Sequence, residues 1–235
     1  MAYREETINK YMAMAAGMIQ KVRANMADYE VSVSKGNNKI GKCLNVSLLP
    51  IITCGGNCKV CKGICYDIKA CLRFPGIRGV LGARAKNTVL AMFDRERYFA
   101  QIDGMMTRRR TNKVMRWHVG GDILDYDYLC RMIDNARNHP DFVIWTYTKQ
   151  YSLVNRYVAE HGGSIEAAIS ANLSIMFSVW EGLECENPHG FATFTCVLNG
   201  HEWPQGVHKC DGACHRCLEG RYGCPFRMSS AVAEH

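Results

Sequence analysis

Apolar residues recur every three or four positions along residues 4–27. The recurring positions are Ile8, Met12, Ala15, Ile19 and Val22. This period predicts an amphipathic helix whose methionines fill a core. The polar stretch SKGNNKIGK then predicts a turn, and the apolar run CLNVSLLPIIT predicts a buried strand. Two further helices are expected across residues 76–107, after a break at Pro75-Gly76.

A regular alternation begins after Asn112. Short runs rich in β-branched and aromatic residues predict strands, and longer periodic segments predict helices. The predicted strands are residues 113–119, 141–148, 172–180 and 191–198, and the predicted helices are residues 125–139 and 151–161. Strands separated by helices of this length indicate βαβ units and a parallel sheet.

The length of the chain limits how many βα units can form, and so whether they can close into a complete barrel. Its 235 residues accommodate about five or six βα steps, whereas a complete eight-stranded barrel takes about 250 residues. We therefore expect an α/β fold that is either an incomplete TIM-like βα barrel or an open parallel sheet. In both architectures, ligands bind at the carboxyl ends of the strands.

Residues 201–227 break the alternation, because they are rich in Cys, Gly and His and have little periodicity. A metal is expected to organise such a segment in place of an apolar core. The predicted organisation is an α/β domain over residues 1–200, with a cysteine-rich loop at 54–65, and a cysteine-rich, metal-binding segment over residues 201–235 that packs on it.

Composition narrows the class of protein. Hydrophobic residues make up 48% of the chain and charged residues 22%, which is typical of globular proteins. The first residues do not resemble a signal peptide, and the apolar runs are too short to span a bilayer, so we expect a cytoplasmic protein with no membrane partner.

The net charge is +7, and Arg108, Arg109 and Arg110 are consecutive. A solvated turn is the simplest interpretation of this run, and a phosphate-binding patch is the alternative.

Thirteen cysteines are the most unusual feature of the composition. In reducing cytosol, dense cysteines hold metal or take part in catalysis more often than they form disulfides, and an odd number excludes complete pairing. The first group lies in the stretch TCGGNCKVCKGICY and consists of Cys54, Cys58, Cys61 and Cys65. Three closely spaced thiolates can hold a four-iron cluster and leave the fourth iron for another ligand. The three are either Cys54, Cys58 and Cys61 or Cys58, Cys61 and Cys65.

The second group lies in the stretch CDGACHRCLEGRYGC and consists of Cys210, Cys214, Cys217 and Cys224. Four thiols suit a closed site, so we expect either a structural zinc ion or a second iron–sulfur cluster there, and the spacing does not separate the two. Three histidines lie nearby in the sequence and are expected to support the thiolates without binding the metal: His201, His208 and His215.

Glycine or polar residues follow each later predicted strand. The motif Gly120-Gly121-Asp122 follows the strand at 113–119, Lys149 follows the strand at 141–148, and Glu181 follows the strand at 172–180. The carboxyl ends of parallel strands meet at one edge of a sheet, so these residues are expected to line one cavity. Lys149 and Glu181 are the candidate catalytic residues, because each can pair with a charged group of a substrate.

Other reactive residue types have simpler interpretations. Cys43, Cys71, Cys130 and Cys196 are expected to pack as small apolar groups. His118 is expected to be a hydrogen-bonded core histidine. Asp125 and Asp127 are expected to cap the helix that follows them.

The order of strand, C-x3-C-x2-C loop and Gly-Gly-acid motif resembles the radical S-adenosylmethionine superfamily. The matching residues here are Cys54, Cys58 and Cys61, followed by GGD at 120–122. This resemblance implies a [4Fe-4S] cluster on three thiolates and S-adenosylmethionine as its ligand. It also implies that Gly120, Gly121 and Asp122 bind the amino group of that ligand.

A second resemblance covers most of the chain. The stretches GNNKIGKCLNVSLLPIITC, CYDIKACLRFPGIR, MRWHVGGDILDYDYL and SSAVAEH are similar to an uncharacterised phage family called gene product 88. In that family's pattern the matching thiols are Cys54, Cys61 and Cys65. Cys65-Tyr66 and Thr148-Lys149 are similar to a neighbouring phage group that resembles radical enzymes. The resemblance implies a protein that acts in the cytoplasm of an infected bacterial host.

These features together predict an iron–sulfur protein resembling a radical S-adenosylmethionine enzyme. It would cleave S-adenosylmethionine reductively and act on an unknown substrate, for which a nucleotide or nucleic acid is a candidate. One alternative is a non-enzymatic, zinc-stapled binding protein, with nucleic acid as a candidate partner. Another is a degenerate barrel that holds a cluster without radical chemistry.

Overall fold

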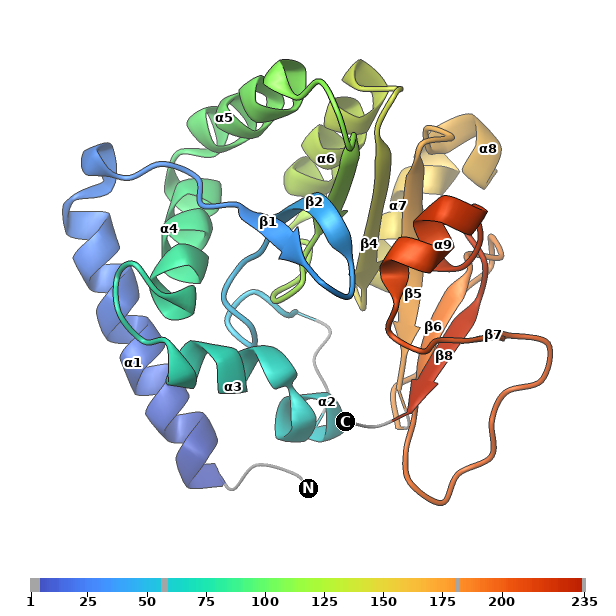
Figure 1. Ribbon diagram of the computed structural model, residues 1–235, viewed down its shortest axis with the longest axis horizontal. Helices are drawn as coiled ribbons and strands as arrows, with labels where there is room; N and C mark the ends of the chain where they lie inside the picture. Colours follow the sequence, from blue (N-terminus) through green and yellow to red (C-terminus); the bar gives the residue numbers. More distant parts are fainter. Residues whose placement is uncertain (1–4, 56–58, 181, 234–235) are drawn as a thin grey trace.

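The computed structural model describes residues 5–55, 59–180 and 182–233. Its centre is an eight-stranded sheet with the order β1-β2-β3-β4-β5-β6-β8-β7 (Figure 1). The strands are β1 (Ser34–Asn37), β2 (Gly41–Val46), β3 (Val114–Trp117), β4 (Val143–Thr148), β5 (Leu173–Val179), β6 (Thr193–Val197), β7 (His208–Lys209) and β8 (Ser230–Ala233). β1 pairs antiparallel with β2, and the other neighbouring pairs are parallel. The prediction of an α/β fold with an open, mostly parallel sheet is confirmed.

The parallel strands follow one another in chain order across the sheet. β2, β3, β4, β5 and β6 are successive neighbours, and β8 lies beside β6. Right-handed crossovers between successive neighbours pass on the same side, so this order places the connecting helices on one face. Figure 1 shows α6 (Tyr126–Asn138) and α7 (Tyr151–Glu160) on one side of the sheet and α9 (Cys214–Gly220) on the other.

The remaining helices flank the first half of the sheet or lie in connections. They are α1 (Glu5–Ala24), α2 (Lys59–Ile64), α3 (Tyr66–Arg73), α4 (Val80–Phe93), α5 (Arg95–Arg108), α8 (Ile165–Ala168) and the short 3-10 helices η1 (Met26–Asp28) and η2 (Cys224–Phe226). Asp125 caps α6 by accepting a hydrogen bond from Tyr128 N at 2.9 Å, as predicted. Asp127 instead forms ion pairs with Arg95 and Arg131. In the described part of the chain, none of these helices is long and apolar enough to cross a bilayer.

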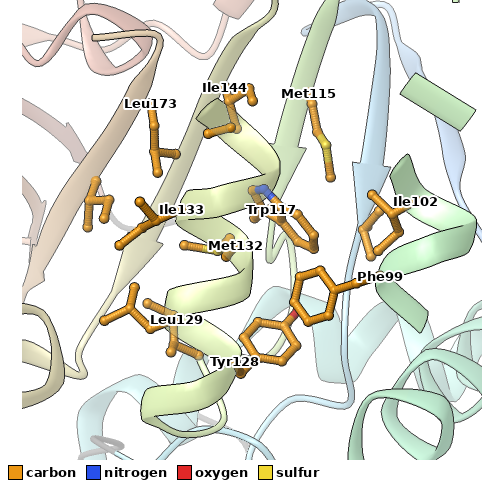
Figure 2. Packing of buried hydrophobic residues seen from close by; sticks show 14 of the residues in the cluster. Phe99, Ile102, Met115, Trp117, Tyr128, Leu129, Met132, Ile133, Ile144 and Leu173 are labelled. Atoms are coloured by element: carbon orange, nitrogen blue, oxygen red, sulfur yellow. The ribbon is translucent and has the colours of Figure 1, made fainter. Parts of the chain in front are cut away.

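Alternate strand residues face the helices and form the main core. Figure 2 shows Met115 and Trp117 of β3 together with residues from α5 and α6. Trp117 is fully buried and lies 5.9 Å from Phe99 and 6.3 Å from Tyr128, between ring centroids. Leu129, Met132 and Ile133 of α6 belong to the same cluster. The spacing of these three residues places them on one face of α6, which explains why this helix covers the sheet.

The opposite face of the sheet is covered by the C-terminal segment. Its buried cluster consists of Ile40, Cys43, Trp145, Met176 and Cys224. Ser174 Oγ donates a hydrogen bond to the Cys224 carbonyl at 2.6 Å, which ties η2 to β5. β8 also pairs with both β6 and β7. The cysteine-rich segment therefore makes apolar and backbone contacts with the sheet.

A third cluster lies between α1, α3 and α4 and supports the loop after β2. Tyr11 and Ile68 are fully buried there. Tyr11 Oη donates to the Pro50 carbonyl at 2.8 Å. Leu49 N donates to Thr88 Oγ1 at 2.9 Å. These bonds fix the loop that leads to the first cysteine group.

Four parts of the secondary structure differ from the sequence-based expectation. The run at 43–53 is a strand only as far as Val46, since Ile51 has a positive φ of 64° and Pro50 has no N–H for a ladder. Residues 34–37 form β1 in place of a turn, and α2 occupies 59–64 in the expected loop. β8 was not expected, because the small residues of SAVA give little strand signal. The other predicted helices and strands are confirmed within a few residues.

Candidate functional site

The loop that leaves β2 carries the first cysteine group to the carboxyl end of the sheet. Leu48 N donates to the Gly120 carbonyl at 2.9 Å, which joins this loop to the loop after β3. Thr53 Oγ1 donates to the Leu49 carbonyl at 2.8 Å. Cys54 N donates to the Ile51 carbonyl at 3.2 Å. Cys54 therefore lies in a turn fixed by the backbone, beside the exit of β3.

Three thiols of the first group lie in the described residues and share one neighbourhood. Cys61 is on α2 and Cys65 is the N-cap of α3, whereas Cys58 lies outside the described residues. Burial raises the pKa of Cys54 to about 12 and that of Cys65 to about 11. Cys65 also raises the pKa of Cys54, and Cys61 raises that of Cys65. The side chains thus lie within electrostatic reach of one another.

Lys149 brings a cation to the same neighbourhood from the exit of β4. Burial lowers its pKa, but the nearby groups of Cys61, Asp122 and Cys54 outweigh this and raise the pKa overall. The ammonium nitrogen lies 5.4 Å from the centroid of the Trp180 ring. These interactions show that Lys149 lies near the thiols of Cys54 and Cys61, and its catalytic role stays a prediction. Glu181, the other candidate, lies outside the described residues.

The Gly120-Gly121-Asp122 motif connects the exits of β3 and β4. The buried carboxylate of Asp122 accepts hydrogen bonds from Thr148 Oγ1 at 2.6 Å and from Lys149 N at 2.9 Å. A third bond comes from Ile123 N at 2.8 Å. Burial raises the pKa of Asp122, although Lys149 and these bonds oppose the rise. Asp122 therefore determines where Lys149 lies.

Both glycines of the motif are explained by close packing. A Cβ on Gly120 would lie 1.7 Å from Asp67 Oδ2. Gly121 has a positive φ of 81°, and a Cβ there would lie 2.7 Å from Leu48 Cβ. A larger residue in place of Gly120 would therefore displace the carboxylate of Asp67, and one in place of Gly121 would displace the loop after β2. The motif holds three loops together at this end of the sheet.

Tyr66 and Asp67 anchor the start of α3 to this assembly. Tyr66 Oη donates to the Val119 carbonyl. Asp67 is buried and forms a two-pronged ion pair with Arg84 of α4, at 3.1 Å and 3.0 Å. Sequence analysis did not find this pair. The position of Asp67, two residues after Cys65, could have marked it as part of the site. Nothing in the sequence indicates that Arg84 is its partner.

The second cysteine group lies on the sheet face that α6 and α7 leave uncovered. Cys217 and Cys224 are 8% and 6% exposed. Burial, together with the nearby thiols of Cys214, Cys210 and Cys224, raises the pKa of Cys217 to about 11. The structure therefore brings these four predicted ligands into one region.

The histidines near the second group have different surroundings. His208 Nε2 lies 3.9 Å from Cys217 Sγ. His215 N donates to the Lys39 carbonyl at 3.1 Å, in the β1–β2 hairpin. His201 N donates to the Leu198 carbonyl at 3.1 Å. His208 is thus adjacent to a thiol, whereas His215 joins α9 to the hairpin.

Arg116 of β3 lies within electrostatic reach of the second cysteine group and of Tyr66, which follows Cys65 in the chain. Burial lowers its pKa, but the phenols of Tyr66 and Tyr147 and the thiols of Cys214 and Cys224 outweigh this and raise it. Its Cζ lies 5.0 Å from the centroid of the Tyr147 ring. Its Nε has no hydrogen-bond partner among the described residues. The helices α2 and α9 lie apart, since Figure 1 shows α2 near one end of the sheet and α9 against one of its faces.

Within the residues that the structure describes, neither group shows the geometry of a complete metal site. Among the described residues, no three His, Cys, Asp or Glu side chains are arranged to hold a metal ion. The structure thus shows which thiols are neighbours.

The residues expected to be structural fit their surroundings. His118 is 4% exposed, and its ring nitrogens lie 3.1 Å from Thr146 Oγ1 and 3.1 Å from Tyr128 Oη. Burial lowers its pKa to about 3. The prediction of a core histidine is confirmed. Cys43 and Cys71 are fully buried, as predicted, while Cys130 and Cys196 are partly exposed.

Fold and site together define a parallel α/β protein with a cysteine-rich loop at the carboxyl ends of its strands. A family model described as gene product 88 matches residues 23–184. Because this match covers more than half of the chain, the protein belongs to the gene product 88 family. The matched range contains the first cysteine group, the GGD motif and Lys149, but not the second cysteine group. Neither the curated proteins nor the solved structures gave a match.

Proposed function

We propose that the first cysteine group holds an iron–sulfur cluster and that the protein acts with S-adenosylmethionine as a radical enzyme. The observation that carries this proposal is the convergence of three successive loops. Cys54 follows β2, Asp122 follows β3 and Lys149 follows β4, and these groups lie near enough to affect one another's pKa. This end of a parallel sheet is where α/β proteins bind ligands.

The donor set suits iron. Thiolates are the usual ligands of iron–sulfur clusters, and three of them leave one iron open to another ligand. The ligands would be three of Cys54, Cys58, Cys61 and Cys65. Without a metal, burial keeps the thiols of Cys54 and Cys65 protonated at neutral pH, and a bound metal ion would favour their deprotonation. When bound, such a cluster supplies one electron to the sulfonium of S-adenosylmethionine.

The chain's own residues would bind and orient the ligand. Lys149 is a partly buried cation that suits a carboxylate or phosphate group. Asp122 holds Lys149 through its backbone N–H, so it is a positioning residue. The three hydrogen bonds that Asp122 accepts leave about one of its acceptor sites for an amino group. Glu181 remains a candidate for contact with the substrate, and the substrate is proposed to be a nucleotide or nucleic acid in an infected bacterial cell.

The second cysteine group is proposed to hold zinc or a further cluster. Its four thiols lie close together on a segment that also packs on the sheet through Cys224. This observation favours a second candidate function, in which metal staples a binding protein and no radical chemistry takes place. A barrel that retains a cluster without cleaving S-adenosylmethionine is the third candidate.

Anaerobic purification followed by metal and product analysis separates these candidates. Iron, sulfide and zinc are measured, and reductant and S-adenosylmethionine are then added. Iron together with 5′-deoxyadenosine supports the radical enzyme. Iron without 5′-deoxyadenosine supports the barrel without radical chemistry, and zinc without iron supports the binding protein.

Single alanine substitutions identify the ligands of the first group. Cys54→Ala retains iron if the ligands are Cys58, Cys61 and Cys65, whereas Cys65→Ala retains iron if they are Cys54, Cys58 and Cys61. Cys71→Ala is the matched control, because Cys71 is a fully buried thiol outside both groups.

A further inference from the structure

Positive charge is concentrated in two stretches of the chain that contain no acid. Residues 31–66 and 104–121 carry ten of the 29 lysines and arginines and none of the 22 aspartates and glutamates. In the rest of the chain, 19 basic residues are outnumbered by 22 acidic ones. The whole excess of positive charge therefore comes from these two stretches, which favours a local positive field.

The fold brings parts of both stretches to one pocket, which we call the hairpin pocket. It has a volume of about 370 Å³ and lies between the β1–β2 hairpin and the C-terminal end of α5. Its cationic lining is Lys35, Lys42, Arg108 and Arg109, and its apolar lining is Val33, Leu44 and Met105. The described residues that line the pocket include no acid.

Three of these cations lack a counter-charge. Within the described chain, Lys35, Lys42 and Arg108 form no ion pair. Lys113, which also lies in an acid-free stretch, is paired with Asp141 and so is already neutralised. An anion that enters the hairpin pocket therefore meets cations without a competing carboxylate.

Arg109 has a different role in the pocket. Its Nε donates to the Asn112 carbonyl at 2.6 Å, and its Nη2 lies 3.4 Å from the Lys42 carbonyl. These bonds join the end of α5 to β2. Arg109 thus holds the two walls of the pocket together, and it is left unchanged in the test below.

We propose that the hairpin pocket binds the phosphate backbone of a nucleic acid strand. Lys35, Lys42 and Arg108 contact the phosphates, and the apolar floor takes the carbon face of a sugar. None of the lining residues is aromatic, so bases are not stacked and binding does not depend on base identity. The proposal rests on the charge and shape of this surface and is independent of any metal in the cysteine groups.

Fluorescence anisotropy with a labelled single strand of mixed sequence, about 20 nucleotides long, tests the proposal. The triple variant Lys35→Ala/Lys42→Ala/Arg108→Ala is expected to bind at least about tenfold more weakly at low salt. The slope of log K against log salt is expected to fall by about two, because each phosphate contact on a single strand contributes about 0.7.

The matched control is Lys21→Ala/Lys69→Ala/Arg78→Ala, which removes the same charge at exposed positions outside the pocket. It is expected to bind within about twofold of the wild type. Equal losses in the two triple variants, or wild-type binding by the pocket variant, would overturn the proposal. Thermal unfolding and iron content of both variants are measured alongside. Unchanged values show that a loss of binding comes from neither misfolding nor a lost cluster.

Competition distinguishes a strand from a free nucleotide, since both carry phosphates. ATP at the same total phosphate concentration is expected to leave most of the labelled strand bound. Displacement of the strand under these conditions would assign the pocket to a nucleotide and overturn the strand proposal. Oligo-dA and oligo-dT are expected to bind equally, and a strong preference for one would contradict binding through the backbone.

Discussion

The two cysteine groups have similar spacing but different surroundings. In each group three cysteines follow the pattern C-x3-C-x2-C. The first lies in a loop that rests on the apolar cluster of α1, α3 and α4 and is also held by polar contacts, such as the Asp67–Arg84 ion pair and the bonds that Asp122 accepts. The second lies on a segment held by apolar packing against Trp145 and Met176. Spacing therefore predicts which ligands are available and does not predict what holds them in place.

The largest difference between the two cysteine groups is expected in iron content after the loss of one thiol from each. Cys61 belongs to both ligand sets predicted from the spacing and to the thiols that match the family's pattern, so Cys61→Ala is expected to lose nearly all iron bound there. Cys217→Ala is expected to leave that iron in place, since α9 lies apart from α2. Iron and sulfide analysis after anaerobic purification measures both. Full retention of iron in Cys61→Ala would show that the first group is not a cluster site.

Breaking the buried ion pair should destabilise the first region. Asp67→Asn leaves Arg84 as a buried cation without its carboxylate, which is expected to lower the free energy of unfolding by about 3–5 kcal/mol. Urea denaturation measures this change. The matched control is Asp127→Asn, where the ion pairs are exposed and a loss below about 1 kcal/mol is expected. Equal losses in the two variants would mean that the buried pair does not stabilise the fold.

Truncating an apolar side chain should instead destabilise the second region. Met176→Ala removes a fully buried side chain beneath η2 and is expected to lower the free energy of unfolding by about 2–5 kcal/mol. Iron content should remain unchanged, whereas Asp67→Asn should reduce it. Loss of iron in Met176→Ala at temperatures where the protein stays folded would show that the two regions are coupled.

Acid should lower the free energy of unfolding, because His118 at the exit of β3 is buried in its neutral form. Its pKa is lowered to about 3 in the folded chain, against about 6.5 when unfolded. The unfolded chain therefore binds a proton first, and stability is lost as pH falls from about 6.5 towards 3, by at most about 1.4 kcal/mol per pH unit. His118→Asn retains a residue that tolerates the positive φ of 54°. Urea denaturation as a function of pH should show a shallower decline in this variant, and identical slopes would exclude His118 as the cause.

Much of the fold could be predicted from the sequence, because periodicity is strong in the second half of the chain. The strand at 172–180 and the helix at 125–139 correspond to β5 and α6 within one or two residues. Both segments bury one consistent face, which leaves a clear pattern. β1 and β8 were missed, because SKGN and SAVA owe their strand pairing to neighbouring segments and not to their own propensity.

The candidate site could be predicted only where it depends on strand exits. Lys149 and the GGD motif follow strands whose ends were visible in the sequence, and the structure brings Lys149 to Cys54 and Cys61. Arg84 and Arg116 were missed, because their roles depend on what packs against a helix or a sheet face. The packing of η2 on the sheet face opposite α6 and α7 could not be predicted either. It depends on contacts between residues about 50 positions apart, such as Ser174 and Cys224, and local sequence patterns do not encode such contacts.

The contact between α9 and the β1–β2 hairpin joins the C-terminal segment to the first strands of the sheet. His215 N and the Lys39 carbonyl are 176 positions apart in the sequence and 3.1 Å apart in space. The amide proton of His215 therefore reports whether the C-terminal segment stays packed against the hairpin. Slow exchange of this proton with deuterium would show that α9 stays bound to the hairpin. Rapid exchange, while the strand amides remain protected, would show that α9 separates from the hairpin without unfolding of the sheet.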